Sequence, residues 1–218
     1  GATLFVLTRL IKVNKLWKVP REAARISARS FTLAWLSLLI AVILLYIATG
    51  DWYIHSNMSD DNAINYGMRL CINLLIVLAV IIPAAQFPFQ GWLIESVAAP
   101  TPVSAIMHAG IVNAGGVILT RFSPVFNDEI AISLLLIIAS ISVLLGSGIS
   151  LVHVDYKRQL VGSTISQMGF MLVQCALGAY FAAIVHLILH GVFKATLFLQ
   201  SGSVVNRFNI PTPPSVKK

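Results

Sequence analysis

The chain has 218 residues, of which 57% are hydrophobic and only 11% are charged. Its mean hydropathy of +0.86 excludes an ordinary soluble domain, because so few polar residues could not coat the core that the apolar residues would form. The net charge of +7 comes without the aromatic-studded basic face of a nucleic-acid-binding protein. The composition therefore predicts an all-α, polytopic membrane protein with no nucleic-acid partner.

Six hydrophobic segments follow one another along the chain, and a helix needs about 20 mostly apolar residues to cross the hydrocarbon core. The predicted membrane region 31–204 contains helices at 31–50, 70–97 (broken near 83–88), 103–120, 130–152, 160–178 and 180–204. We expect residues 1–30 to be a basic cytoplasmic segment with the end of an upstream helix, and 205–218 to be a cytoplasmic connection. Since the sequence has no initial methionine or signal peptide, we expect an internal segment of a longer protein.

Basic residues are concentrated on one side of this predicted bundle. That side carries Arg9, Lys12, Lys15, Lys18, Arg21, Arg25, Arg29, Lys157, Arg158, Arg207, Lys217 and Lys218. The opposite side carries only Arg69 and Arg121. Because cytoplasmic loops are enriched in Lys and Arg, the rich side is predicted to be cytoplasmic and the loop 51–69 external. The segment 9–29 is also suited to contact anionic membrane lipid.

The second hydrophobic segment contains Pro83 and Pro88 on either side of Gln86. Two missing amide donors predict a break in the helix, and broken backbone at membrane depth is tolerated where it is buried in protein or lines a cavity. Gln86 is therefore expected to face an internal polar cavity. A proline kink relieved by neighbouring helices is the alternative. Glu95, near the cytoplasmic end, is a further cavity candidate, although solvent would also accommodate it.

The last hydrophobic segment carries His186, His190 and Lys194 at four-residue steps, so a helix places them on one stripe. A charged group facing lipid costs on the order of 2.5–3.5 kcal/mol, so such residues face the bundle interior or a wet cavity. Interhelical hydrogen bonds would explain one histidine, and snorkelling would explain one lysine. Zinc would need a third ligand that the spacing does not supply. The pattern favours a chain of groups that pass protons, with no metal.

Two more polar residues lie in the segment 103–120, among small residues that allow helices to approach closely. His108 and Asn113 each need a polar partner or water there. They are candidates for continuing the stripe.

Cys71 and Cys175 have no companion ligands and are expected to be small buried hydrophobes. Since no Walker, Rossmann, CxxC or HExxH motif occurs, no cofactor and no catalytic chemistry of its own are predicted.

Three motifs in order give the chain a family resemblance. They are "AAQFPFQGWLIESVAAPTPVSAIMHAGIVNAGGVILTRFSP", "DYKRQLVGSTISQMGFM" and "FAAIVHLILHGVFKATLFLQSGSV". From about Leu70 to Val205 the chain resembles the proton-translocating, antiporter-like membrane subunits, which include NADH–quinone oxidoreductase chain 5 and the Mrp cation/proton antiporters. Within this superfamily it looks most like the DabB-type (MpsA) subunits of bacterial inorganic-carbon accumulation complexes.

The resemblance implies a bundle of about fourteen helices in the bacterial cell membrane, of which this chain is a middle portion. The "HxxxHxxxK" helix is a proton-path helix in relatives, which implies that role for His186, His190 and Lys194. The histidine after "PTPVSA" carries over to His108. DabB-type subunits pair with a large peripheral, zinc-containing DabA-type subunit, and a flux of protons or sodium ions drives conversion of CO2 to bicarbonate there.

The chain also departs from the respiratory and Mrp pattern. Where those pumps have a lysine four residues before the Phe/Leu-Pro motif, this chain has Pro83, and residues 1–18 contain no carboxylate to pair with it. Gln90 stands where a histidine is often found. These departures favour an inorganic-carbon uptake subunit over the alternative, a proton-pumping subunit of NADH–quinone oxidoreductase or an Mrp-type antiporter. A structural membrane anchor for a peripheral enzyme is a third hypothesis.

The charge asymmetry gives a topology prediction. A cysteine introduced at Ser56, in the predicted external loop, should react with a membrane-impermeant maleimide added outside intact cells. Labelling of that cysteine only after the cytoplasmic face is exposed would contradict the assigned orientation.

Overall fold

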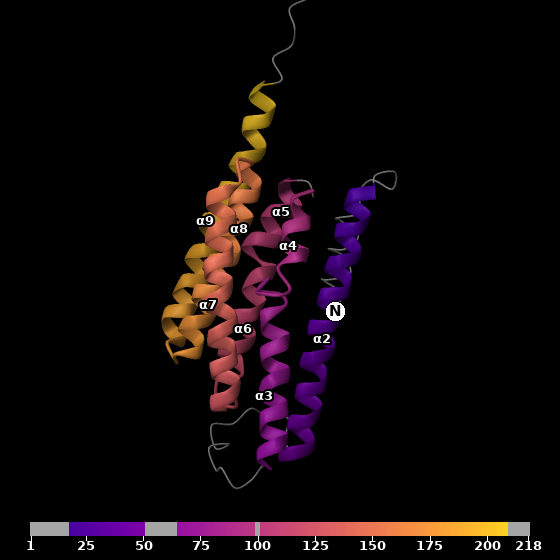
Figure 1. Cartoon of the computed structure of the whole chain (residues 1–218), viewed down its shortest axis with the longest axis vertical. Helices are drawn as coiled ribbons and strands as arrows, with labels where there is room; N and C mark the ends of the chain where they lie inside the picture. Colours follow the sequence, from indigo (N-terminus) through magenta and orange to yellow (C-terminus); the bar gives the residue numbers. More distant parts are fainter. Residues whose placement is uncertain (1–17, 51–64, 99–100, 209–218) are drawn as a thin grey trace, which may run out of the picture.

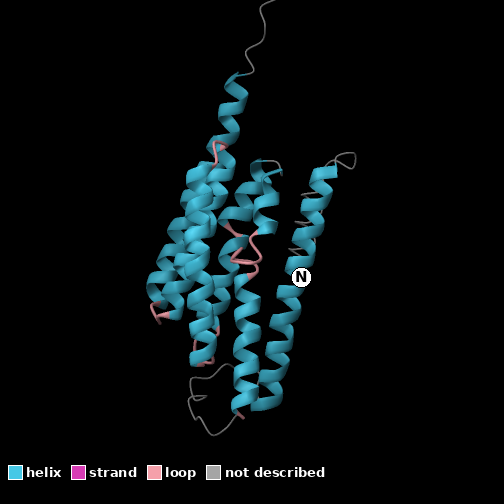
Figure 2. Ribbon diagram, in the orientation of Figure 1, coloured by secondary structure: helices cyan, strands magenta, loops and turns pink. Residues whose placement is uncertain are grey.

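The computed structural model describes residues 18–50, 65–98 and 101–208, and all regular structure within these ranges is helical (Figures 1 and 2). The longer helices are α2 (Lys18–Thr49), α3 (Tyr66–Ile81), α7 (Glu129–Val152), α8 (Tyr156–Ala176) and α9 (Tyr180–Phe208). The shorter ones are α4 (Gly91–Glu95), η2 (Ser96–Ala98), α5 (Thr101–Ala109), η3 (Ile111–Asn113) and α6 (Ala114–Arg121). The predictions for residues 1–17, the loop 51–64 and residues 209–218 concern parts of the chain outside the described residues.

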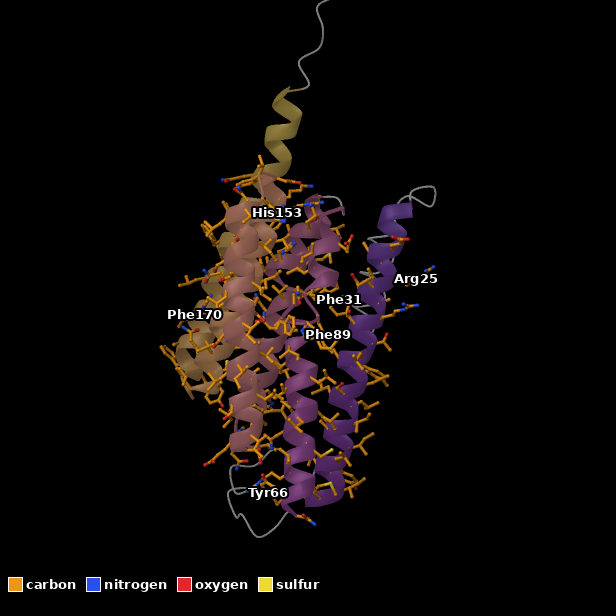
Figure 3. The ribbon with its side chains drawn as sticks, viewed as in Figure 1. Arg25, Phe31, Tyr66, Phe89, His153 and Phe170 are labelled. Carbon is orange, nitrogen blue, oxygen red and sulfur yellow. The ribbon has the colours of Figure 1, made fainter. Side chains whose placement is uncertain are left out.

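Four stretches of helix in the described ranges are long and apolar enough to cross a membrane: Glu22–Thr49, Pro102–Arg121, Glu129–Val152 and Tyr180–Gln200. Helix α3 is apolar but shorter, and α8 packs beside α7 in the same bundle. Tyr66 at the start of α3 and His153 after α7 lie at opposite ends of this bundle (Figure 3). The turn at His153 lies at the same end as the start of α2, so the bundle places two of the lysine- and arginine-rich segments together.

The first helix begins at Lys18 rather than at Phe31, so the basic segment is partly helical. Alanines at 23 and 24 are buried against the bundle while Arg25 and Arg29 are exposed, which lets this helix extend beyond the apolar stretch with its charges in solvent. Pro20 lies in the first turn, where its missing N–H costs no helical hydrogen bond. At the other end of the chain, α9 continues past the predicted boundary to Phe208.

The segment predicted as one helix over 103–120 is divided at Gly110. Here α5 ends, a 3-10 turn follows, and α6 begins at Ala114. The Gly110 amide still donates to the Ile106 carbonyl at 2.9 Å, but a Cβ atom at this glycine would lie 2.9 Å from the same oxygen. The glycine therefore permits a tightened backbone that another residue would crowd.

The predicted break near the two prolines lies in the connection Ile82–Gln90, midway along the bundle (Figure 2). Helix α3 ends at Ile81, as expected for a helix that meets a proline. Ala85 then adopts a left-handed conformation with φ of 53°, and the Gln86 amide donates back to the Ile81 carbonyl at 2.9 Å. This pattern satisfies carbonyl groups at the end of the helix, with alanine in the place that glycine usually takes.

Neighbouring helices supply the remaining partners of this connection. The Phe87 amide donates to Ser142 Oγ on α7 at 2.8 Å, and Trp92 Nε1 donates to the Ile82 carbonyl at 2.8 Å. Trp92 is fully buried, and its ring lies 4.6 Å from that of Phe31 on α2. Because these backbone groups have hydrogen-bond partners in the protein, the interrupted backbone can exist at membrane depth.

Helices α7 and α8 pack closely through small residues. A Cβ atom at Gly146 would lie 2.5 Å from the Ser166 backbone nitrogen and 2.8 Å from the Gly162 oxygen. The hydroxyls of Ser147 and Ser166 are 3.0 Å apart across the same contact. Glycine therefore sets the distance between the two helices, which in turn sets the position of the outer face of α8.

Substitution of Gly146 by alanine should force α7 and α8 apart and lower the free energy of unfolding by about 1–3 kcal/mol. Gly148 is the matched control, since a Cβ atom there meets nothing within 4 Å. Gly148→Ala should be neutral or stabilise by up to about 1 kcal/mol through helix propensity. Unfolding of the purified protein in detergent measures both; equal effects at the two positions would contradict the close contact.

Substitution of Ser142 by alanine should leave the part-buried Phe87 amide without its acceptor and destabilise the break by about 1–3 kcal/mol. Ser140→Ala, at an exposed position on the same helix, is the control. Hydrogen exchange at the Phe87 amide reports on the connection directly. We expect faster exchange in Ser142→Ala only, and unchanged exchange there would show that Ser142 does not hold the break.

Candidate functional site

The side chains of α9 at the predicted stripe become more buried toward Lys194. His186 is partly buried, His190 is 5% exposed and Lys194 is 2% exposed. The rings of His186 and His190 are 6.1 Å apart between centroids. The structure thus brings the three predicted residues together on one face of α9, and this face packs against α8.

Helix α8 supplies the polar partners of both ends of the stripe. Lys194 Nζ donates to Ser163 Oγ at 2.5 Å and to the Leu160 carbonyl at 3.2 Å. At the other end, His186 Nδ1 and Gln174 Oε1 are 3.2 Å apart. The lysine amine therefore does not snorkel to an interface but is solvated by protein groups within the span Tyr180–Gln200.

His108 on α5 joins the stripe at its C-terminal side. Its ring is fully buried and stacks on Phe198, with centroids 4.3 Å apart and planes inclined by 14°. Phe198 follows Lys194 by one further four-residue step, so His108 lies beyond the lysine and not beside His186. Among the described residues, neither ring nitrogen of His108 or of His190 has a hydrogen-bond partner. The described part of the chain thus leaves four imidazole nitrogens available in this interior.

An open groove of about 890 Å³ runs between α8 and α9. Its walls are Leu160, Phe181, Ala182, Val185, Leu189, Phe193 and Leu197. Its polar lining is Ser163, Gln167, His186, His190 and Lys194. The stripe therefore has one side that a solvent molecule or another helix can reach, while its other side is sealed against the bundle.

The carboxylates of the described residues lie near helix ends, away from the stripe. Asp128 and Asp155 cap the starts of α7 and α8, where their oxygens accept backbone amides. Lys194 forms no ion pair with any described carboxylate, and its printed partners are uncharged. Among the described residues no three His, Cys, Asp or Glu side chains are grouped to hold a metal ion. The arrangement suits proton exchange between neutral and charged nitrogen groups.

The residues predicted around the break are not gathered into one cavity. Gln86 is fully buried, but its Nε2 donates to the Ala84 carbonyl at 2.6 Å and to the Ile165 carbonyl of α8 at 3.3 Å, so it packs against backbone and does not line the groove. Pro83 is buried, whereas Pro88 and Glu95 are exposed. Those two residues are therefore not enclosed with Gln86 in this structure, and their role in a cavity stays a prediction.

Asn113 is closer to the stripe than to the break. It is 7% exposed, and its Nδ2 donates to the Ala109 carbonyl at 2.8 Å. A Cβ atom at Gly191 would lie 3.4 Å from Asn113 Nδ2, so this amide faces α9 next to His190.

Of the two cysteines, Cys175 is buried as expected, but Cys71 is exposed on the outward side of α3.

Three residues of the site were not anticipated from the sequence: Ser142, Ser163 and Gln174. Ser163, Gln167 and Gln174 are separated by four and seven residues, which is helical spacing for one face. Polar residues at that spacing in an apolar segment are a signal that could have identified the face of α8 that meets α9. Ser142 gives no such signal, because its role depends on a contact with a residue far away in the chain.

Known proteins match almost the whole chain. The family model described as "NADH:quinone oxidoreductase/Mrp antiporter, TM" matches residues 1–212. The "Probable inorganic carbon transporter subunit DabB" of Bacillus subtilis (strain 168) is 65% identical over 214 residues, which are 97% of this chain and 42% of that protein. The protein of the same name from Bacillus anthracis is 64% identical over 212 residues, 96% of this chain and 42% of that protein. The chain thus spans under half the length of these curated relatives.

More distant similarity extends to respiratory-type proteins. The chloroplastic "NAD(P)H-quinone oxidoreductase subunit 5" of Ranunculus macranthus is 38% identical over 179 residues, 78% of this chain and 24% of that protein. Among solved structures, the archaeal membrane-bound sulfane sulfur reductase contains a chain that superposes with a TM-score of 0.82 at 23% identity, over 93% of this chain and 43% of that one. The chain is therefore a multi-pass membrane protein with the antiporter-like subunit fold, and it belongs to the NADH:quinone oxidoreductase/Mrp antiporter transmembrane family.

Proposed function

We propose that this chain is part of a cation-conducting membrane subunit, conducting protons, in an energy-coupled complex that takes up inorganic carbon as CO2 or bicarbonate. The observation that carries the proposal is the stripe of His186, His190 and Lys194 inside one apolar helix. Proton conduction requires groups that change charge at membrane depth, and a helix lined only by leucine has none. The subunit itself supplies conduction and not catalysis.

The surroundings of Lys194 support a role beyond packing. Burying an amine is costly because the charged form loses its hydration. Ser163 and the Leu160 carbonyl recover part of that cost, yet neither neutralises the charge. A lysine held this way exchanges between charged and neutral forms more readily than one locked in an ion pair. An imidazole can accept a proton at one ring nitrogen and donate one from the other, so the neighbouring histidines suit the adjoining steps.

Inorganic-carbon uptake is favoured over respiration by two observations. Identity is 65% to the Bacillus subtilis relative named as an inorganic carbon transporter subunit, against 38% to the chloroplastic oxidoreductase subunit. In addition, Pro83 replaces the lysine that the respiratory and antiporter pattern places before the Phe-Pro motif. Without that lysine, the break contains no side chain that changes charge.

We infer that the subunit works with a large peripheral subunit of the DabA type, containing zinc, that converts CO2 to bicarbonate while this subunit conducts cations. The name of the Bacillus subtilis relative, a transporter subunit, supports a complex of this kind. The end of the bundle that carries the start of α2 and the turn at His153 would face this partner in the cytoplasm.

The proposal is tested by growth in ambient air. Cells lacking carbonic anhydrase should grow when the intact protein is expressed with its neighbouring peripheral subunit. Lys194→Met keeps the length and apolar bulk of the side chain but removes the titrating group, so growth should fall to that of cells without the complex. Lys157→Met, which removes a lysine at the start of α8, is the control and should sustain growth.

Membrane insertion and co-purification with the partner must be measured for the same variants. If Lys194→Met inserts, binds the partner and supports full growth, the stripe is packing and the conduction proposal fails. If the intact pair does not rescue growth but drives proton movement on addition of a reduced nicotinamide, the respiratory alternative replaces it.

A further inference from the structure

The contact between Gln174 and His186 determines which ring nitrogen carries the proton. Gln174 Oε1 lies 3.2 Å from His186 Nδ1. With the Gln174 amide oriented as in the structure, its oxygen accepts the hydrogen bond and His186 Nδ1 is the donor. In a neutral imidazole the other nitrogen, Nε2, then has no proton and is the acceptor. This is the reverse of the tautomer that a histidine side chain favours in water.

We propose that Gln174 is a positioning residue that fixes the Nδ1–H tautomer of His186 and thereby keeps Nε2 as the atom that takes up a proton. The tautomer is a property of the ring and its partner, and only its consequence for conduction rests on the proposed function. A histidine in a relay must accept at one nitrogen and donate at the other. The hydrogen bond made by one nitrogen therefore decides the role of the other.

The surroundings of the ring support a fixed orientation. Phe170 and Gln174 are four residues apart on α8, and the Phe170 ring lies 6.1 Å from the His186 ring. On α9 the His190 ring approaches the other way, edge-on, with centroids 6.1 Å apart. The Phe170 side chain lies on the outer side of the bundle (Figure 3). The imidazole is thus bounded by an aromatic ring, an amide and a second imidazole, and rotation would remove its hydrogen bond.

The contact between Gln174 and His186 is one of two polar contacts that α8 makes with the stripe on α9. Gln174 meets His186 at one end of the stripe, and Ser163 meets Lys194 at the other. The helices run antiparallel, so these contacts hold the stripe at both ends. His190 lies between them, and no group of the described residues forms a hydrogen bond with either of its ring nitrogens. A fixed tautomer at His186 gives the chain of groups a defined direction at its less buried end.

Nitrogen NMR of the intact protein in lipid bilayers tests the proposal, because protonated and unprotonated ring nitrogens differ widely in 15N shift. With 15N-labelled histidine, the His186 signals are assigned as those lost in His186→Gln. We expect Nδ1 of His186 to be protonated in the wild-type protein. In Gln174→Leu, which removes the acceptor, the proton should move to Nε2. In Gln174→Glu, an ionised carboxylate still accepts, and Nδ1 should stay protonated.

Gln167→Leu is the matched control, since Gln167 is seven residues before Gln174 on the same face of α8 and lines the same groove. It should leave the His186 signals unchanged. An Nε2–H tautomer in the wild-type protein would overturn the proposal without any variant. So would an Nδ1–H tautomer that persists in Gln174→Leu, or a change of the same size in Gln167→Leu.

Growth in ambient air separates this inference from the proposed function. If the tautomer changes in Gln174→Leu and growth is lost, the positioning role of Gln174 and the proposed function both stand. If the tautomer changes while growth is full, Gln174 still fixes the tautomer and His186 is not a conducting group. If the tautomer does not change, the positioning role fails whatever the growth result.

Discussion

Polar groups at membrane depth need hydrogen-bond partners that the protein itself supplies. The packing of the helices in this bundle provides such partners. In the hydrocarbon core, water does not satisfy an exposed amide, amine or imidazole, and each unsatisfied group costs several kcal/mol. The chain places two sets of such groups in its apolar helices: the open backbone between α3 and α4, and the stripe on α9. Other helices supply hydrogen-bond partners to both sets: Ser142 to the break, and Ser163 and Gln174 to the stripe.

Helix α8 serves both sets at once. On one face its Ile165 carbonyl accepts Gln86 Nε2 from the break, and on another its Leu160 carbonyl and Ser163 hydroxyl accept Lys194 Nζ. A third face contacts α7 through Gly146 and Gly162. Because α7 in turn holds the Phe87 amide through Ser142, a change in the distance between α7 and α8 alters both the break and the floor of the stripe. Helix α8 therefore contacts both the break and the stripe.

The sequence was sufficient for features that depend on local chemistry. The apolar segments predicted an all-helical membrane fold, the prolines predicted where a helix stops, and the four-residue spacing placed His186, His190 and Lys194 on one face. It was not sufficient for features that depend on which helices touch. Ser142 looks like an ordinary polar residue until the fold brings it to Phe87, and the spacing of Gln174 on α8 does not show that it meets His186. Pro88 and Glu95 lie close in sequence to the buried Gln86, but both are exposed in the fold.

The break and the stripe differ in one respect that bears on the proposed function. The connection Ile82–Gln90 contains only uncharged side chains, and its buried amide, Gln86, cannot change charge. The stripe contains three titratable groups within two turns of helix, beside a groove. If protons move through this chain, the steps that take up and release them belong to the stripe, while the break contributes polarity and backbone geometry. A path organised in this way would enter beside α8 and α9, where Ser163 and Gln174 already hold its two ends.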